Sequence, residues 1–161
     1  MAISENLFAV NTGMTEPTVY FMHYFFETCR ELGRMDVFMQ RMAFWFQQVE
    51  LGFKTTYENG NPFTNRSDCH AWGGHPLFHF HSSLLGVRPS APGFTAIEVR
   101  PQLAGLDQLA GRMPHPQGEI ACDLRMEHGQ LRGSITLPAN LGGTLHANGG
   151  THTLVGGRNT F

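Results

Sequence analysis

Hydrophobic and polar positions follow different patterns in the two halves of the chain. Before about residue 85, apolar side chains fill long runs with few interruptions by Pro or Gly, which is typical of helices. After about residue 90, apolar and polar side chains alternate in short segments bounded by glycines, which is typical of antiparallel strands. The pattern predicts an α+β fold, with a helical segment over residues 1–88 and a small antiparallel β-sandwich over residues 89–161.

Two helices are expected in the first 52 residues. Thr15 can cap the first helix, and Pro17 is tolerated in an opening turn. Residues 19–32 contain neither Pro nor Gly, and Gly33 provides a stop. Residues 36–51 predict a second helix, which is again followed by a glycine.

A third helix is expected after a polar stretch. Ser67 or Asp68 can cap its exposed N–H groups, and the helix would run to about residue 85 with Gly86 as its stop. Pro76 lies inside this stretch. It therefore either starts the main helix or kinks it.

Apolar side chains cover nearly the whole circumference of the first expected helix, and the second is almost as apolar. A helix that is apolar on all sides has to be buried on all sides. Either the sandwich or another chain must cover these helices, so we expect a homo-oligomer formed through the helical half. The apolar residues of the first helix are Val19, Tyr20, Phe21, Met22, Tyr24, Phe25 and Phe26.

The second half predicts short strands joined by tight turns. Residues 88–93 are rich in Pro and are interpreted as a linker without regular structure. Gly129 closes an expected hairpin, and the glycine pairs at 142–143 and 149–150 mark two further turns. The expected strands are residues 94–99, 120–126, 131–137, 144–147 and 151–155.

Composition excludes several functional classes. The 161 residues carry 11 Lys+Arg and 13 Asp+Glu, a formal net charge of −2, with no basic stripe for nucleic acid. No apolar run approaches about 18 residues, so no membrane partner is expected. The first residues do not resemble a signal peptide, and an odd number of cysteines, three, argues against a disulfide framework. We therefore expect a reducing, cytoplasmic location.

The densest polar cluster lies between the second and third expected helices, over residues 54–61 and 65–76. Loops on a rigid scaffold are where functional sites usually lie. His75 and His79 stand four residues apart, on one helical face, so a zinc site can be drawn there. Since no HExxH or CxxC pattern is present, we expect no metal and no cofactor, and interpret these histidines as lining a helical interior.

The same cluster resembles the end of the catalytic domain of bacterial α-L-rhamnosidases. Residues 16–34 are similar to two late helices of the barrel in that family, and residues 101–103 and 114–118 to its C-terminal β-domain. The resemblance implies the last part of an (α/α)6 barrel that removes terminal L-rhamnose with inversion. The stretches that carry it are GFKTTYE at 52–58, RSDCHAWGGHPL at 66–77 and LGVRPSAPGF at 85–94.

The resemblance also implies residue roles. Glu58 matches the general base, His70 matches a histidine that contacts the sugar, and Trp72 is placed to stack on a sugar or to back the site. Asp68 is the second catalytic candidate, with a helix cap as its alternative role. Arg66 and Tyr57 complete the candidate sugar-binding set, although Arg66 also fits a loop salt bridge and Trp72 a core position.

The general acid of the family lies in a part of the barrel that this sequence does not contain. Inversion needs two carboxyl groups about 6.5–9.5 Å apart. The leading hypothesis is therefore a glycoside hydrolase that needs a second copy to complete its site. The alternatives are a non-catalytic carbohydrate-binding module and a truncated remnant of a rhamnosidase.

Overall fold

The computed structural model describes residue 8, residues 15–61 and residues 63–161. The chain divides into two compact units, Met1–Pro76 and Leu77–Phe161. The expected α+β class, with helices followed by a β-sandwich, is confirmed. The division at residue 88 that the sequence suggests stays a prediction about domains.

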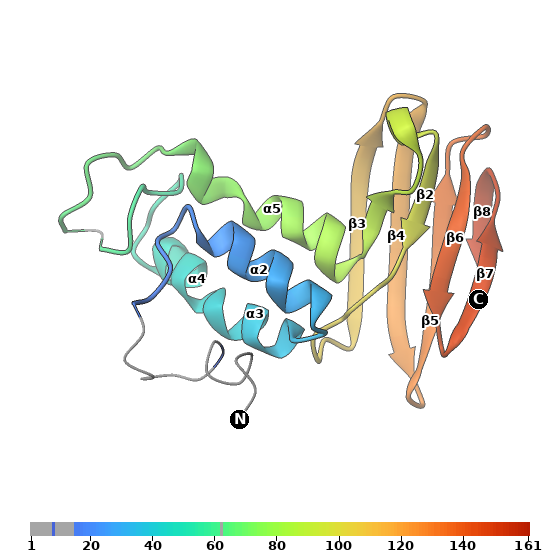
Figure 1. The fold of residues 1–161 in the computed structure, drawn as a ribbon, viewed down its shortest axis with the longest axis horizontal. Coiled ribbons are helices and arrows are strands. Elements are labelled where there is room, and N and C mark those ends of the chain that lie inside the picture. Colours follow the sequence, from blue (N-terminus) through green and yellow to red (C-terminus); the bar gives the residue numbers. More distant parts are fainter. Residues whose placement is uncertain (1–7, 9–14, 62) are drawn as a thin grey trace. The chain divides into compact units, whose positions relative to one another are not determined.

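Within residues 15–61 and 63–76, the first unit contains three α-helices and a long loop (Figure 1). The helices are α2 (Met22–Glu31), α3 (Met35–Arg41) and α4 (Ala43–Glu50), and a short 3-10 turn, Ala71–Gly74, follows the loop. Helix α3 contacts both α2 and α4. An aromatic core lies between these helices. In it Phe26 of α2 and Phe38 of α3 are fully buried, with ring centroids 4.5 Å apart.

The first helix begins later than the sequence predicts. It starts at Met22, and no side chain caps its first turn, so the expected Thr15 cap is absent. The Thr18 hydroxyl accepts the N–H of Phe21 at 3.3 Å in the turn that precedes the helix. The end of the helix is confirmed, since Gly33 has a φ of +66° and the chain closes back onto the last turn.

The second expected helix is in fact two helices. Met42 ends α3 and begins α4, and its side chain is buried at the junction. Apolar side chains continue on both sides of the break, so the sequence pattern gave no sign of it. Gly52 ends the pair with a φ of +84°, as predicted.

No helix begins at Asp68, so that prediction was wrong. The N–H of His70 donates to the carbonyl of Thr56 at 2.8 Å. The backbone at His70 is therefore hydrogen-bonded to the loop around Thr56 and does not form a helical turn. Pro76 starts α5 (Pro76–His79), which continues as a π-helical turn, Phe80–Leu84, up to Gly86. Of the two roles considered for this proline, the structure therefore supports the first.

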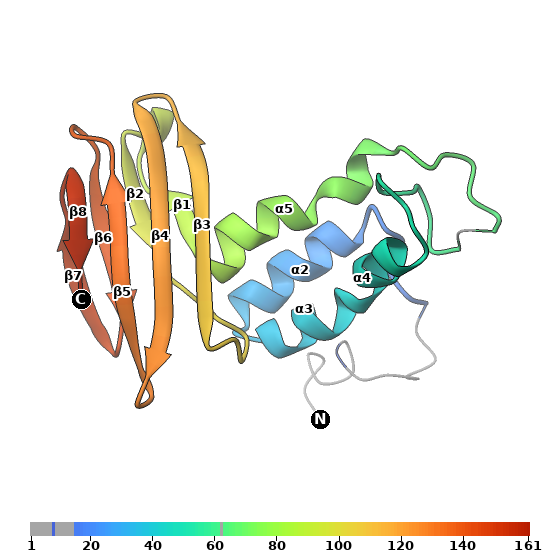
Figure 2. The ribbon, with the colours of Figure 1, turned by 180° about the vertical axis from the view of Figure 1, so that it is seen from behind.

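The second unit contains two four-stranded sheets. Their orders are β1-β2-β6-β7 and β3-β4-β5-β8, and Figure 2 shows β3, β4 and β5 in front of the other sheet. The strands are β1 (Val87–Pro89), β2 (Ala96–Val99), β3 (Gln108–His115), β4 (Gly118–Glu127), β5 (Gln130–Leu137), β6 (Gly142–Ala147), β7 (Gly150–Leu154) and β8 (Gly157–Thr160).

Apolar side chains from both sheets form one core between the layers. Ile97 and Leu145 come from the first sheet, Leu124 and Ile135 from the second, and each is almost fully buried. This is the arrangement that alternating apolar positions produce when two sheets pack face to face.

Several details of the sandwich differ from the expectation. The segment taken as a linker contains β1, and Gly142 and Gly143 lie inside β6 instead of forming a turn. A Cβ on Gly143 would lie 2.2 Å from the carbonyl oxygen of Ile97, so this glycine permits the close parallel pairing of β2 with β6. Strands β3 and β8 were not predicted. The expected hairpin at Gly129 is confirmed, with His128 and Gly129 both at positive φ.

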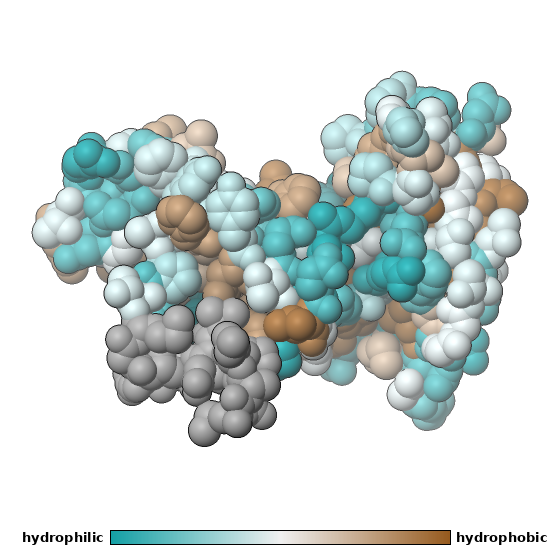
Figure 3. Space-filling view, in the orientation of Figure 1, coloured by the Kyte–Doolittle hydropathy of each residue, from teal (hydrophilic) through white to brown (hydrophobic). Residues whose placement is uncertain are grey.

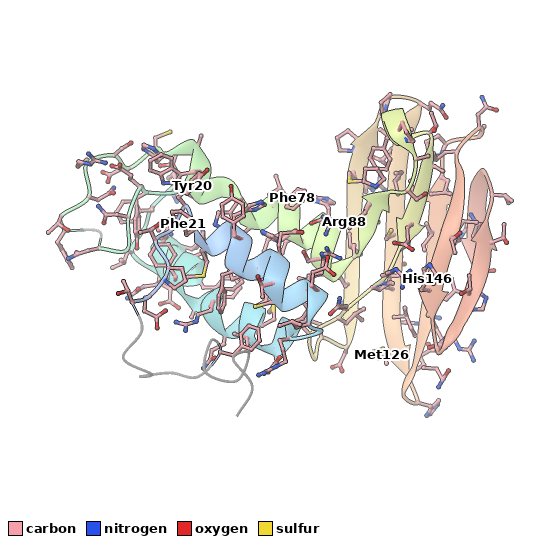
Figure 4. The ribbon with its side chains drawn as sticks, in the orientation of Figure 1. Tyr20, Phe21, Phe78, Arg88, Met126 and His146 are labelled. Carbon is pink, nitrogen blue, oxygen red and sulfur yellow. The ribbon has the colours of Figure 1, made fainter. Side chains whose placement is uncertain are left out.

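The expectation that α2 is buried on all sides is wrong for the chain by itself. Phe25 and Phe26 are buried, but Tyr20, Phe21 and Tyr24 are about half exposed. Apolar surface is visible among hydrophilic side chains in Figure 3, and Figure 4 marks Tyr20 and Phe21 near the start of the helix.

Candidate functional site

The loop that follows α4 folds back on itself and brings the expected site residues together. The N–H of Glu58 donates to the carbonyl of Ser67 at 3.0 Å, and the Thr56 hydroxyl donates to the carbonyl of His70 at 3.1 Å. Two segments about ten residues apart in sequence therefore run side by side within the first unit.

Glu58 lies at the centre of this arrangement. It is only 7% exposed, and its carboxylate makes a two-point ion pair with Arg66, whose Nε lies 3.1 Å from Oε2. The Arg66 side chain is 81% exposed and its charged partner raises the pKa of the guanidinium. A fork-shaped contact of this kind fixes the carboxylate in orientation as well as in charge.

Asn65 is a site residue that sequence reasoning missed. Its Oδ1 accepts the N–H of Glu58 at 3.0 Å and that of Asn59 at 3.3 Å, while its Nδ2 donates to Oδ1 of Asp68 at 2.8 Å. A short polar side chain that satisfies backbone groups in a loop is a known role of Asn. The Asn-rich composition of this loop was the available signal.

An open cleft of about 410 Å³ lies beside Glu58. The indole N–H of Trp72 donates to the carbonyl of Glu58 at 3.0 Å, and the rings of Tyr20 and Trp72 are 5.7 Å apart. The cleft is therefore lined by aromatic faces beside one ion pair, a mixture typical of small-molecule sites. Its lining residues are Thr18, Tyr20, Glu58, Asn59, Arg66 and Trp72.

The other expected site residues lie at different distances from the cleft. His70 does not line the cleft, but its ring packs against that of Trp72 at an angle of 50°, with ring centroids 3.9 Å apart. Asp68 is linked to Glu58 only through Asn65. Tyr57 is fully buried against Phe44 and Phe53, and this burial raises the pKa of its phenol. The structure thus unites Glu58, Arg66 and Trp72 and places Tyr57 in the core.

The two histidines considered for zinc are hydrogen-bonded within their own units. His75 Nε2 lies 3.0 Å from the carbonyl of Val19, and burial lowers the pKa of His75 to about 4. His79 Nδ1 lies 3.1 Å from the Ser83 hydroxyl. His75 is therefore a neutral histidine at neutral pH.

Comparison with known proteins agrees with the fold and with the resemblance. Residues 86–161 match the family model described as the bacterial alpha-L-rhamnosidase C-terminal domain. This part of the chain is therefore similar to the C-terminal domain of bacterial α-L-rhamnosidases. The predicted resemblance to the C-terminal part of the bacterial α-L-rhamnosidases is confirmed.

The proteins to which the chain is similar include three rhamnosidases. The chain is 28% identical over 130 residues to the alpha-L-rhamnosidase of Alteromonas sp. (strain LOR), covering 71% of this chain. Among solved structures, the GH78 family rhamnosidase of Bacillus sp. GL1 has a TM-score of 0.80, with 24% identity and 89% of this chain covered. The α-L-rhamnosidase from Aspergillus terreus has a TM-score of 0.76, with 20% identity and 86% covered.

The relatives are much longer than this chain. It spans 14% of the Alteromonas protein, 16% of the Bacillus structure and 18% of the Aspergillus structure. At these identities the solved structures establish the fold of this chain. None of the helices in the described residues is both long and apolar enough to cross a bilayer.

Proposed function

We propose that the cleft of the helical unit binds the terminal sugar of an α-L-rhamnoside and that Glu58 is the general base that activates water for its hydrolysis. The observation that carries this proposal is the buried Glu58 carboxylate, which Arg66 holds in a fixed orientation at the wall of an aromatic cleft. The rhamnosidase relatives supply the substrate class.

The side chains around Glu58 suit a sugar. Trp72 and Tyr20 offer ring surfaces for the C–H faces of a pyranose, and Asn59 and Arg66 offer hydrogen-bond donors for its hydroxyls. Asp68, which we carry as a second catalytic candidate, would act through Asn65, and His70 would steady the Trp72 ring.

Hydrolysis with inversion requires a second carboxyl group on the opposite side of the scissile bond. Among the described residues, Glu58 is the one carboxylate that lines the cleft. We propose that a second copy supplies the acid through a homo-oligomer formed by the helical half. Exposed apolar side chains on and after α4, at Phe46, Val49 and Leu51, support this interface.

The test measures release of 4-nitrophenol from its α-L-rhamnoside by the parent chain and by Glu58→Gln. Loss of the general base is expected to slow the reaction about 10²–10⁴-fold. Glu119→Gln, which removes an exposed carboxylate of β4 outside the helical half, is expected to leave the rate unchanged. Undiminished hydrolysis by Glu58→Gln would remove Glu58 as the base. A stable monomer in sedimentation at micromolar concentration would exclude the second copy.

The second candidate is a non-catalytic carbohydrate-binding function. It is favoured by the lone carboxylate of the cleft lining, which Arg66 already engages. Release of 4-nitrophenol distinguishes the two functions, because a binding module binds L-rhamnose but does not hydrolyse the 4-nitrophenyl glycoside. We place either function in a reducing, cytoplasmic setting, which the three free cysteines support.

A further inference from the structure

Four exposed aromatic rings form a continuous surface that starts in the cleft and continues along α2. We name this surface, made of Tyr20, Phe21, Tyr24 and Trp72, the aromatic platform. Tyr20 is its centre, since its ring lies 5.7 Å from Trp72, 5.4 Å from Phe21 and 6.0 Å from Tyr24. Phe21 and Tyr24 are 5.8 Å apart and close the group.

Each ring of the platform is substantially open to solvent. The exposed fractions are 45% for Tyr20, 58% for Phe21, 52% for Tyr24 and 39% for Trp72. Tyr20 and Trp72 also line the cleft, whereas Phe21 and Tyr24 lie beyond its lining. The platform therefore has an inner half beside Glu58 and an outer half that leads away from it.

We propose that the outer half of the aromatic platform binds the group attached to the terminal sugar of a glycoside, a flat ring joined through the glycosidic oxygen. This inference rests on the proposed function and deepens it, because it assigns Phe21 and Tyr24 to the leaving-group side of the same cleft. Tyr20 belongs to both halves, so a ligand longer than one sugar passes over it from Glu58 to the helix surface.

The chemistry of the platform favours a small polar ring over a covering helix. The neighbouring phenol of Tyr20 raises the pKa of Tyr24. Rings with hydroxyl groups present an apolar body and a polar edge, which suits a partly wet ligand site. By contrast, Val49 and Leu51 form an aliphatic surface at the end of α4, which suits a protein contact better.

The experiment compares the affinity of the full chain for L-rhamnose with that for phenyl 1-thio-α-L-rhamnoside and for a rhamnosyl-glucose disaccharide. The thioglycoside resists hydrolysis and adds one aromatic ring, while the disaccharide adds one sugar ring. An added ring that packs on the platform is expected to tighten binding about three- to tenfold. The larger gain is expected for the thioglycoside, because its added ring is flat, and a larger gain for the disaccharide would contradict a site for a flat ring.

Phe21→Ala and Tyr24→Ala are expected to abolish that gain and to leave the affinity for L-rhamnose unchanged. Phe63→Ala removes another aromatic ring, 91% exposed and outside the cleft lining, and is expected to change neither value. Because all three side chains are exposed, melting temperatures close to that of the parent chain would show that the variants remain folded.

The outcomes separate this inference from the proposed function. If neither added ring increases the affinity over that for L-rhamnose, the proposed role of the aromatic platform is wrong, although the cleft can still bind the sugar. The same conclusion follows if Phe21→Ala weakens the binding of L-rhamnose as much as that of the longer ligands. Conversion of an oligomer to a monomer by Tyr24→Ala shows a second copy on the platform and also overturns the inference. If L-rhamnose does not bind but the thioglycoside binds and depends on Phe21 and Tyr24, the proposal that the cleft binds L-rhamnose is wrong. The proposed role of the aromatic platform is then still supported.

Discussion

The side-chain oxygen of Asn65 accepts the backbone N–H of Glu58 at 3.0 Å, while the side-chain nitrogen of the same residue donates to Asp68. One amide thus joins the two carboxylate-bearing segments of the loop. The position of Glu58 in this loop therefore depends on a neutral side chain.

Asn65→Ala is expected to lower the free energy of unfolding of the helical unit by about 1 to 3 kcal/mol. The substitution leaves the partly buried N–H groups of Glu58 and Asn59 without their side-chain acceptor. Urea unfolding followed by tryptophan fluorescence reports on this unit, because both tryptophans of the chain lie within it.

Asn61→Ala is the matched control. Asn61 makes the same kind of contact, accepting the N–H of Phe63 at 2.9 Å, but at an exposed position. Its replacement is expected to change the free energy of unfolding by less than about 0.5 kcal/mol. Equal effects of the two substitutions would show that Asn65 does not anchor Glu58.

The partly buried imidazole of His75 predicts a loss of stability in acid. Burial lowers the pKa of His75 from 6.5 to about 4, so the unfolded chain binds more protons than the folded one between these values. The stabilisation is complete above about pH 6.5. It is expected to decline as the pH falls toward 4, by at most about 3 kcal/mol.

Unfolding by urea between pH 4 and 7 measures this dependence. His75→Gln keeps a donor for the carbonyl of Val19 but does not titrate in this range, so the decline is expected to become shallower. His152→Gln, at an exposed position in β7, is expected to leave the slope unchanged. If the free energy of unfolding of His75→Gln depends on pH as steeply as that of the parent, the acid sensitivity comes from other groups.

The three thiols are expected to differ sharply in reactivity. Cys29 and Cys122 are buried, and burial raises the pKa of each to about 12, whereas Cys69 is exposed. Since the thiolate is the reactive form, a disulfide reagent such as Ellman's reagent is expected to modify one thiol per native chain and three after denaturation. In Cys69→Ser the fast reaction should disappear; a remaining fast thiol would mean that one of the buried sites opens readily.

A single glycine of the sandwich is expected to be very sensitive to substitution. Gly133 has a φ of +147°, and a Cβ there would lie 2.0 Å from the carbonyl oxygen of Asp123 on the neighbouring strand. Gly133→Ala therefore combines a strained backbone with a clash against main chain, and a cost of about 3 kcal/mol or more is expected.

Thermal unfolding followed by the β-sheet circular dichroism signal checks this cost. Gly129→Asn is the control, because Gly129 also has positive φ but a Cβ there would meet nothing within 4 Å. Asn tolerates the left-handed region, so the change is expected to be small. A Gly133→Ala protein as stable as Gly129→Asn would show that β4 and β5 can separate without penalty.

Much of the architecture could be predicted because it depends on local patterns. Gly33, Gly52 and Gly86 all end helices at positive φ, as predicted, since a left-handed residue at a helix end favours glycine whatever surrounds it. Alternation of apolar positions likewise predicted β2, β4 and β5, because the side-chain period of a strand does not depend on its neighbours.

The resemblance in the loop also located the candidate site. It singled out Glu58, Arg66 and Trp72, which the structure brings around one cleft. It gave Tyr57 a sugar-binding role as well, although that side chain is fully buried between Phe44 and Phe53. Adjacent residues in an extended loop point to opposite sides, so sequence proximity to Glu58 carried no information on what Tyr57 faces.

The sequence by itself determined the α+β class, the helix stops, the central hairpin of the sandwich and the choice of the loop after α4 as the candidate site. Only the tertiary structure decided that the loop folds back through Thr56 and His70, that Asn65 supports Glu58, and that β2 pairs in parallel with β6. The reason is that stops and periodicities depend on the residues themselves and their near neighbours. Hydrogen bonds and pairings between distant segments depend on which surfaces the whole fold brings together.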